Sequence, residues 1–234
     1  MMMVSPLEDL GRMELDWLSA RFHFSFADYV DPARMGHSQL RVLNDDLFRP
    51  GGGFPMHPHR DMEIITYVRS GAVTHEDSLG NRGVVKAGEV QVMTAGSGVV
   101  HSEFNLGDED LTLFQIWIHP DEKGLTPRWE TKPFSRNDRK GRLVPLVSGV
   151  NGKEGLNVLT INQDVTLLSA DLAPGQKCDY KIDPGRRAYL IPARGGIVVN
   201  GVEAPERAGV AITGERALSI EAVEDAEVVL LDLP

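Results

Sequence analysis

Short runs rich in Val, Ile, Thr, Tyr and Phe recur between residues 38 and 118, and glycine-containing turns separate them. Such runs are typical of β-sheet proteins, because β-branched and aromatic side chains fit a pleated, half-buried surface. Helical periodicity is weak in the same region. The predicted strands are residues 39–43, 63–69, 73–76, 83–86, 90–94 and 112–118. Several hairpins of this kind would close a small sandwich or barrel, so we predict an all-β fold.

The second half of the chain repeats this character. Residues 193–198 can be laid against residues 69–74, and residues 207–211 against residues 86–90, at similar internal spacing. We interpret this as a duplicated β domain. The further predicted strands are residues 165–172, 188–191, 197–199, 209–213, 218–222 and 227–233. A proline- and charge-rich stretch lies between the halves, so the predicted division is a first domain at 1–118, a connector at 119–152 and a second domain at 153–234.

Composition excludes several classes of protein. The 234 residues suffice for a sizeable core, and the apolar runs are far shorter than the roughly 20 residues of a membrane helix. The N-terminus lacks the features of a secretory signal, so we expect a cytoplasmic protein. A net charge of −10 argues against direct nucleic-acid binding but leaves a protein partner possible. Cys178 is the only cysteine, which excludes an intramolecular disulfide and a thiolate-rich zinc site.

The histidines are distributed unevenly, because all 7 precede residue 120. His57 and His59 are two residues apart, so both imidazoles of an extended chain point to one face, with Cα atoms about 6.6 Å apart. A metal about 2.0–2.2 Å from each ring nitrogen fits between two such side chains. His101 and Glu103 have the same parity. Two facing pairs would supply three imidazoles and one carboxylate to one divalent metal, although Glu63 also fits by parity.

Two stretches resemble the motifs of the cupin family. Residues 51–71 resemble the first motif, with His57, His59 and Glu63 in order and a final spacer one residue longer than usual. Residues 88–105 resemble the second, with His101 and Asn105, although Gly96 stands in place of a proline and the gap after Gly88 is longer. This resemblance implies two tandem cupin domains, each a double-stranded β-helix or jelly-roll barrel.

The stretches around His57, His75 and His101 resemble the pirin family of bicupins more specifically. Members of that family pair a metal-bearing N-terminal cupin with a metal-free C-terminal one, in agreement with the distribution of histidines. The pirin pattern implies the ligands His57, His59, His101 and Glu103, whereas ordinary cupins use the carboxylate at the position of Glu63. In the pirin pattern Glu63 would support the ligands or face the substrate. The other histidines are expected to be structural: His23, His37, His75 and His119.

The same resemblance implies quercetin 2,3-dioxygenase activity, in which dioxygen opens a flavonol ring and carbon monoxide is released. The donor set suits Fe(II) as a first choice, and also Mn, Co, Ni, Cu or Zn, since affinity alone does not select among them. Glu103 or Glu63 would accept the proton of the substrate's 3-hydroxyl group. Nearby apolar side chains could line a flat pocket: Phe54, Met56, Phe104, Phe114 and Trp117.

Two alternatives remain open from the sequence. Other pirin-like proteins are described as metal-dependent regulators that bind a transcription factor or a metabolic enzyme, in which case a surface would carry the function. The cupin fold also hosts many chemistries, so a metal-dependent isomerase or another enzyme acting on a different small molecule is a third hypothesis.

Overall fold

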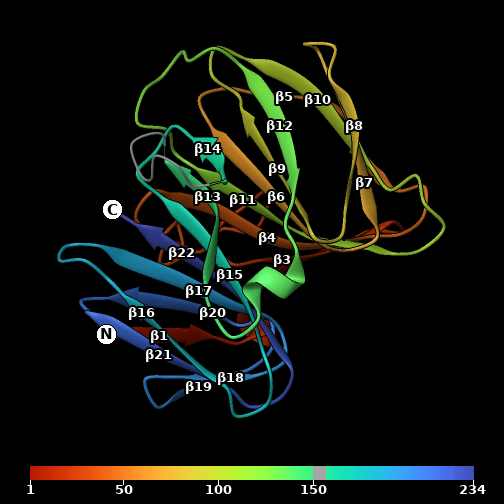
Figure 1. Cartoon of the computed structure of the whole chain (residues 1–234). Coiled ribbons are helices and arrows are strands. Elements are labelled where there is room, and N and C mark those ends of the chain that lie inside the picture. The colour runs from red at the N-terminus through yellow and green to blue at the C-terminus, as the bar shows by residue number, and fades with distance from the viewer. Residues whose placement is uncertain (150–156) are drawn as a thin grey trace. The chain divides into compact units, whose positions relative to one another are not determined.

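The computed structural model describes residues 1–149 and 157–234, and nearly all of its regular structure is β-strand (Figure 1). The chain divides into two compact units. The N-terminal unit comprises Gly11–Phe134 and Leu159–Gln163, and the C-terminal unit comprises Met1–Leu10, Ser135–Val158 and Asp164–Pro234. The predicted all-β fold with two cupin barrels is confirmed. Within the described ranges, no helix has the length and apolar character needed to cross a membrane.

The N-terminal unit has a large and a small antiparallel sheet. Its strands are β2 (Gly11–Glu14), β3 (Leu18–Phe22), β4 (Leu40–Phe48), β5 (Gly53–His59), β6 (Glu63–Ser70), β7 (Ala72–Asp77), β8 (Arg82–Lys86), β9 (Glu89–Thr94), β10 (Val99–Phe104), β11 (Leu111–Ile118) and β12 (Arg128–Pro133). The large sheet has the order β12-β9-β6-β11-β4-β3-β2, and the small one has the order β5-β10-β7-β8. The short strand β14 (Leu159–Ile161) also lies in this unit.

The C-terminal unit repeats this plan. Its strands are β1 (Met2–Ser5), β13 (Val144–Gly149), β15 (Thr166–Leu172), β16 (Lys177–Lys181), β17 (Arg187–Arg194), β18 (Ile197–Val199), β19 (Val202–Ala204), β20 (Gly209–Thr213), β21 (Ala217–Ala222) and β22 (Ala226–Leu233). They form a sheet with the order β1-β20-β17-β22-β15-β13 and a second with the order β16-β21-β18-β19. Two short 3-10 helices, η1 (Leu7–Asp9) and η2 (Arg136–Arg139), complete the unit.

Burial explains which strands occupy the centre of each unit. Strand β22 is buried along its whole length, and β11, at the same place in the N-terminal unit, is nearly so. Both are mostly apolar, as expected of strands covered on both faces, although β22 contains Glu227 and Asp232 and β11 contains Thr112 and Gln115. Close backbone approach shapes the small sheet too, because a Cβ added to Gly53 would lie 2.3 Å from the backbone oxygen of Glu103. Glycine therefore allows β5 to lie directly beside β10.

The compact units differ from the predicted domain ranges of 1–118 and 153–234. The first ten residues lie in the C-terminal unit, because β1 pairs with β20 from Met2↔Ile212 to Ser5↔Gly209. Residues 159–163 lie in the N-terminal unit, although they were assigned to the second domain. These exchanges join segments far apart in sequence, which local patterns do not encode.

The stretch at 119–152 is more than a connector. Strand β12 pairs with β9, and β13 pairs with β15. The prolines and charges that suggested a connector are compatible with β12 because it is an edge strand, where part of the backbone needs no partner. Residues 150–152 of the predicted connector lie outside the described residues.

Candidate metal centre

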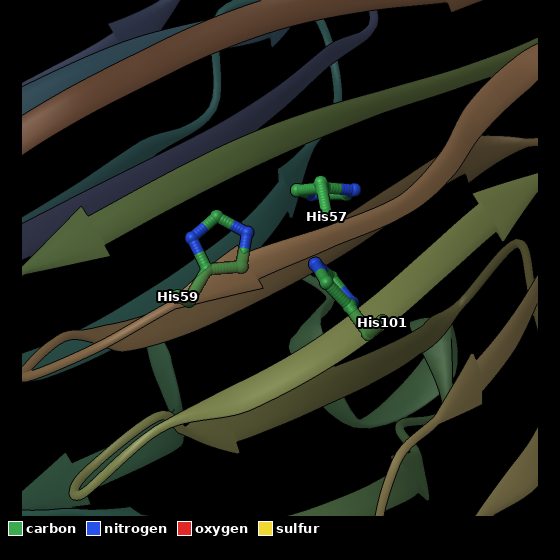
Figure 2. Close-up of side chains that lie close together, drawn as sticks. All are labelled: His57, His59 and His101. Atoms are coloured by element: carbon green, nitrogen blue, oxygen red, sulfur yellow. The ribbon is translucent and has the colours of Figure 1, made fainter.

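Three histidines meet where β5 lies against β10. The antiparallel register places His57 opposite His101 and His59 opposite Val99. The imidazole centroids are 4.5 Å apart for His57 and His101, 4.8 Å for His57 and His59, and 4.9 Å for His59 and His101. One ring nitrogen of each residue lies within 4.8 Å of the others, and Figure 2 shows the three rings gathered together. The two imidazoles of His57 and His59 therefore lie on one face of the extended strand β5, as their spacing of two residues predicted.

The environment keeps two of these imidazoles neutral. Burial, together with the neighbouring imidazoles of His101 and His57, lowers the pKa of His59 to about 3. Burial, together with His57 and His75, likewise lowers the pKa of His101 to about 3. A neutral imidazole has a nitrogen lone pair, which a metal ion requires. The cluster is therefore ready to act as a ligand set at neutral pH.

Hydrogen bonds identify which nitrogens are free to bind. His57 Nδ1 lies 2.8 Å from the carbonyl oxygen of Pro55, which can only accept, so Nδ1 donates and Nε2 keeps the lone pair. His101 Nε2 is buried and has no hydrogen-bond partner among residues 1–149 and 157–234. An unpartnered buried nitrogen is costly unless it has another use. The donor atoms thus fit a divalent transition metal.

Glu103 lies on β10 two residues after His101, with a register shift relative to β5 between them. Its carboxylate is buried and accepts hydrogen bonds from Gln91 Nε2 at 2.8 Å and from the side-chain amide of Gln115. The structure groups Glu103 with His101 and His75 within 4.8 Å, whereas His57 and His59 form their own group with His101. His101 is common to both groups, and Glu103 lines the same cavity as the three clustered histidines.

Glu63 has a different setting at the start of β6. Its Oε2 accepts a hydrogen bond from Thr94 Oγ1 at 2.9 Å, and its Oε1 accepts one from Asn162 Nδ2 at 2.9 Å. Burial raises the pKa of the Glu63 carboxyl, although both hydrogen bonds oppose the shift. Among the described residues, Glu63 belongs to neither group of possible ligands, and it does not line the cavity.

A cavity of about 200 Å³ lies beside the cluster, and all three clustered histidines contribute to its wall. Phe54 and Trp117 line it as predicted, and the Trp117 ring lies edge-on to His59 at 4.9 Å. Met56 is instead exposed and Phe114 is packed in the core. The remaining wall is mostly apolar, with four polar side chains: Asn44, Asp46, Glu103 and Gln115.

Several residues of the centre were not predicted from the sequence. His75 was expected to be structural, yet its ring lies 5.2 Å from that of His101. Asp46 lines the cavity, and burial, followed by the neighbouring carboxylates of Asp45 and Glu103, raises its pKa well above the ordinary value. The one available signal was the spacing of His75, on the predicted strand 73–76, and Asp77, one residue after its end. Nothing in the sequence pointed to Asp46.

Comparison with known proteins agrees with this geometry. Residues 5–118 match the family model described as Pirin, and residues 146–233 match the Quercetinase C-terminal cupin domain. The chain is 49% identical to a pirin-like protein of Caulobacter vibrioides, with 97% of each chain covered. It is 43% identical to the quercetin 2,3-dioxygenase of Escherichia coli K12, covering 100% of this chain and 99% of that one.

Solved structures give the same result. The nickel(II) complex of the bacterial pirin YhhW from Escherichia coli superimposes with a TM-score of 0.93 at 42% identity. The superposition covers 100% of this chain and 99% of that chain. The two family models, the relatives and the solved structures therefore agree, and the chain belongs to the pirin family of bicupins.

Proposed function

We propose that this protein is a metal-dependent dioxygenase of the quercetin 2,3-dioxygenase type, which opens a flavonol ring with dioxygen and releases carbon monoxide. The observation that carries the proposal is the group of three imidazoles, two of them with a pKa of about 3, in the wall of a mostly apolar cavity. Relatives that carry this name support the reaction class.

The proposed ligands are His57, His59, His101 and Glu103. Three imidazoles and one carboxylate suit Fe(II), which we propose first, and also Mn, Co, Ni, Cu or Zn. A nickel(II) complex of a close structural relative supports a divalent metal at this centre without selecting among them. When bound, the metal would act as a Lewis acid toward the 3-hydroxyl oxygen of the flavonol and supply the one-electron chemistry that dioxygen requires.

The protein itself would handle the proton. The Glu103 carboxylate would accept the 3-hydroxyl proton on one oxygen, while Gln91 and Gln115 hold the group in position through their amides. Oε1 of Glu103 also accepts a hydrogen bond from Thr66 Oγ1 at 3.4 Å, so Oε2, which accepts only from Gln115, is the oxygen that retains a lone pair for this proton. Glu63 is a weaker candidate for this role, because among the described residues it does not line the cavity, whereas Glu103 does.

The cavity would bind and desolvate the reacting ring. Its apolar wall, with Phe26, Ile64 and Trp117, suits a flat aromatic group and excludes water from the centre. A volume of about 200 Å³ is below the roughly 300 Å³ at which pockets for drug-sized ligands begin. We therefore expect the ring that is cleaved to enter the cavity while the rest of the flavonol projects from it.

Oxygen consumption with quercetin tests this proposal. Protein loaded with each of Fe, Mn, Co, Ni and Cu is mixed with quercetin, and dioxygen uptake and carbon monoxide release are recorded. We expect turnover with at least one metal, none with the His57→Ala/His101→Ala variant, and normal turnover with His119→Ala, because His119 is exposed and outside the cluster. Absence of turnover with every metal would overturn the proposal and return attention to the regulator and to other cupin chemistries.

A further inference from the structure

His75 lies behind His101, on the side away from the clustered histidines. Strand β7 pairs with β10 on the edge opposite β5, so that His101 lies opposite Asp77 and Glu103 opposite His75. His75 is fully buried, and its Nδ1 lies 3.4 Å from Nδ1 of His101. Two nitrogens at hydrogen-bond distance need one proton between them, so the protonation of His75 decides that of His101.

Asp77 fixes the protonation of His75. Its Oδ1 accepts hydrogen bonds from the backbone N–H groups of Leu79 at 2.9 Å and Asn81 at 3.0 Å. Its Oδ2 accepts one from Asn81 Nδ2 at 2.9 Å and lies 3.1 Å from Nε2 of His75. An oxygen that only accepts requires the proton on His75 Nε2, which leaves the lone pair on His75 Nδ1. The shared proton must then belong to His101 Nδ1, and His101 Nε2 is left bare.

We propose that Asp77 and His75 are positioning residues that lock His101 in its Nδ1–H tautomer and so present its Nε2 lone pair to the metal. The unpartnered His101 Nε2 is the atom that this relay predicts to be free within the described chain. Partners of this kind behind a metal-bound histidine fix its tautomer and ring orientation. The inference rests on the metal centre of the proposed function.

Trp129 connects the relay to the carboxylate. Its indole ring stacks on His75 with centroids 5.0 Å apart and planes 11° apart. Its Nε1 donates a hydrogen bond to Gln91 Oε1 at 2.7 Å, and Gln91 Nε2 donates one to Glu103. One side chain from β12 therefore supports the residues behind both His101 and Glu103. This gives β12, which the sequence suggested was connector, a place in the site.

A rival reading makes His75 a ligand, since its ring nitrogen lies within 4.8 Å of donors on His101 and Glu103. The two readings differ for His75→Asn. An asparagine oxygen can accept the proton of His101 Nδ1 but is a poor ligand for a transition metal. We expect His75→Asn to keep most of the metal affinity and His75→Leu to lose about 10- to 100-fold. Loss of affinity to the same extent in both variants would overturn the relay.

The sharpest variant is Asp77→Asn. The two backbone N–H groups hold the remaining oxygen of the new amide, so its NH₂ group must face His75. That NH₂ donates to His75 Nε2, moves the proton to His75 Nδ1 and forces the proton of His101 onto Nε2, where the metal would bind. The matched control is Asn81→Ala, which removes a contact of the same turn without reaching His75.

Two measurements test the relay. In ¹⁵N-histidine-labelled, metal-free protein, nuclear magnetic resonance should report the Nδ1–H tautomer of His101 in the wild type and in Asn81→Ala, and the Nε2–H tautomer in Asp77→Asn. Calorimetric titration with nickel(II) should show Asp77→Asn weaker than Asn81→Ala by about 10- to 100-fold.

The outcomes separate the relay from the proposed function. An unchanged His101 tautomer in Asp77→Asn, or equal nickel affinity in Asp77→Asn and Asn81→Ala, overturns the relay alone. If the wild type binds no nickel, the metal centre itself fails, and the positioning role fails with it. Should Asp77→Asn not fold, the His75→Asn and His75→Leu pair decides.

Discussion

On strand β10 of the N-terminal unit the buried positions include His101 and Glu103, whereas on β21, at the same place in the C-terminal unit, they include Ile220 and Ala222. The registers correspond too. His101 lies opposite His57 across the first pair of strands, and Ile220 lies opposite Cys178 across the second.

The rest of the C-terminal interior is also apolar where the N-terminal interior is polar. Its core cluster is built from buried apolar side chains, including Ile197 and Val199 on β18, the counterpart of the strand that carries His75. Burial raises the pKa of Cys178 to about 11, so this thiol stays protonated and packs as a small apolar group. The comparison teaches that one strand order supports either a packed core or a polar centre. In the latter case each buried polar group needs a partner or a ligand.

Converting the first barrel toward the second gives the largest expected effect. His101→Ile copies Ile220 and removes the ligand that the two groups of donors share. We expect metal binding, measured by calorimetric titration with nickel(II), to be abolished. The variant removes the unpartnered buried Nε2 of His101 but also takes away the hydrogen-bond partner of His75 Nδ1, so we expect little net change in the free energy of unfolding of the metal-free protein. Retention of nickel affinity would contradict the assigned ligands.

The reciprocal change is made in the C-terminal barrel. Ile220 is fully buried, so Ile220→Ala should lower the free energy of unfolding by about 2–5 kcal/mol through lost apolar contact and a cavity. Nickel affinity of the folded protein should stay at the wild-type value, since the barrel with this core supplies none of the proposed ligands. Chemical denaturation and calorimetry check the two parts. A large loss of metal affinity would show that the units are not independent in function.

The two glutamates of the N-terminal barrel sharpen the comparison further. Glu103→Gln removes a charge from the donor set and should weaken nickel affinity by about 10- to 100-fold, as well as slowing turnover. Glu63→Gln keeps the shape of a side chain that Thr94 and Asn162 already satisfy, so its nickel affinity should match the wild type. The opposite ranking of the two variants would make Glu63 the ligand.

Acid should act on the first barrel more than on the second. The unfolded chain binds protons at His59 and His101 below the ordinary pKa of 6.5, whereas the folded chain does so only near pH 3. The metal-free protein should therefore lose stability as the pH falls from about 6.5 to 3. Denaturation midpoints across this range should fall less steeply for His101→Ile. Equal slopes for the two proteins would contradict neutral, buried imidazoles.

Many of the strands and the three clustered histidines were predictable from local sequence. Residues 197–199 and 209–213 were predicted as strands at the bounds that β18 and β20 have, because short β-branched runs between glycines are unambiguous. The meeting of His57, His59 and His101 followed from parity and from the pirin-like motifs. Each of these signals is contained within one short stretch of sequence.

The rest depends on contacts between distant segments. The pairing of β1 with β20 joins residues more than 200 positions apart, and no local pattern encodes it. Trp129 reaches the centre only because β12 pairs with β9, and the satisfaction of Glu63 depends on Asn162. Sequence parity allowed Glu63 and Glu103 equally as metal ligands, and only the tertiary contacts distinguish between them.

X-ray absorption and anomalous diffraction on the nickel(II)-loaded protein test the metal centre most directly. We expect one ion per chain, about 2.0–2.2 Å from Nε2 of His57, Nε2 of His101 and a ring nitrogen of His59, with a carboxylate oxygen of Glu103 completing the set. An ion held by His75 and Glu103 without His57 and His59, or an ion in the C-terminal barrel, would contradict it.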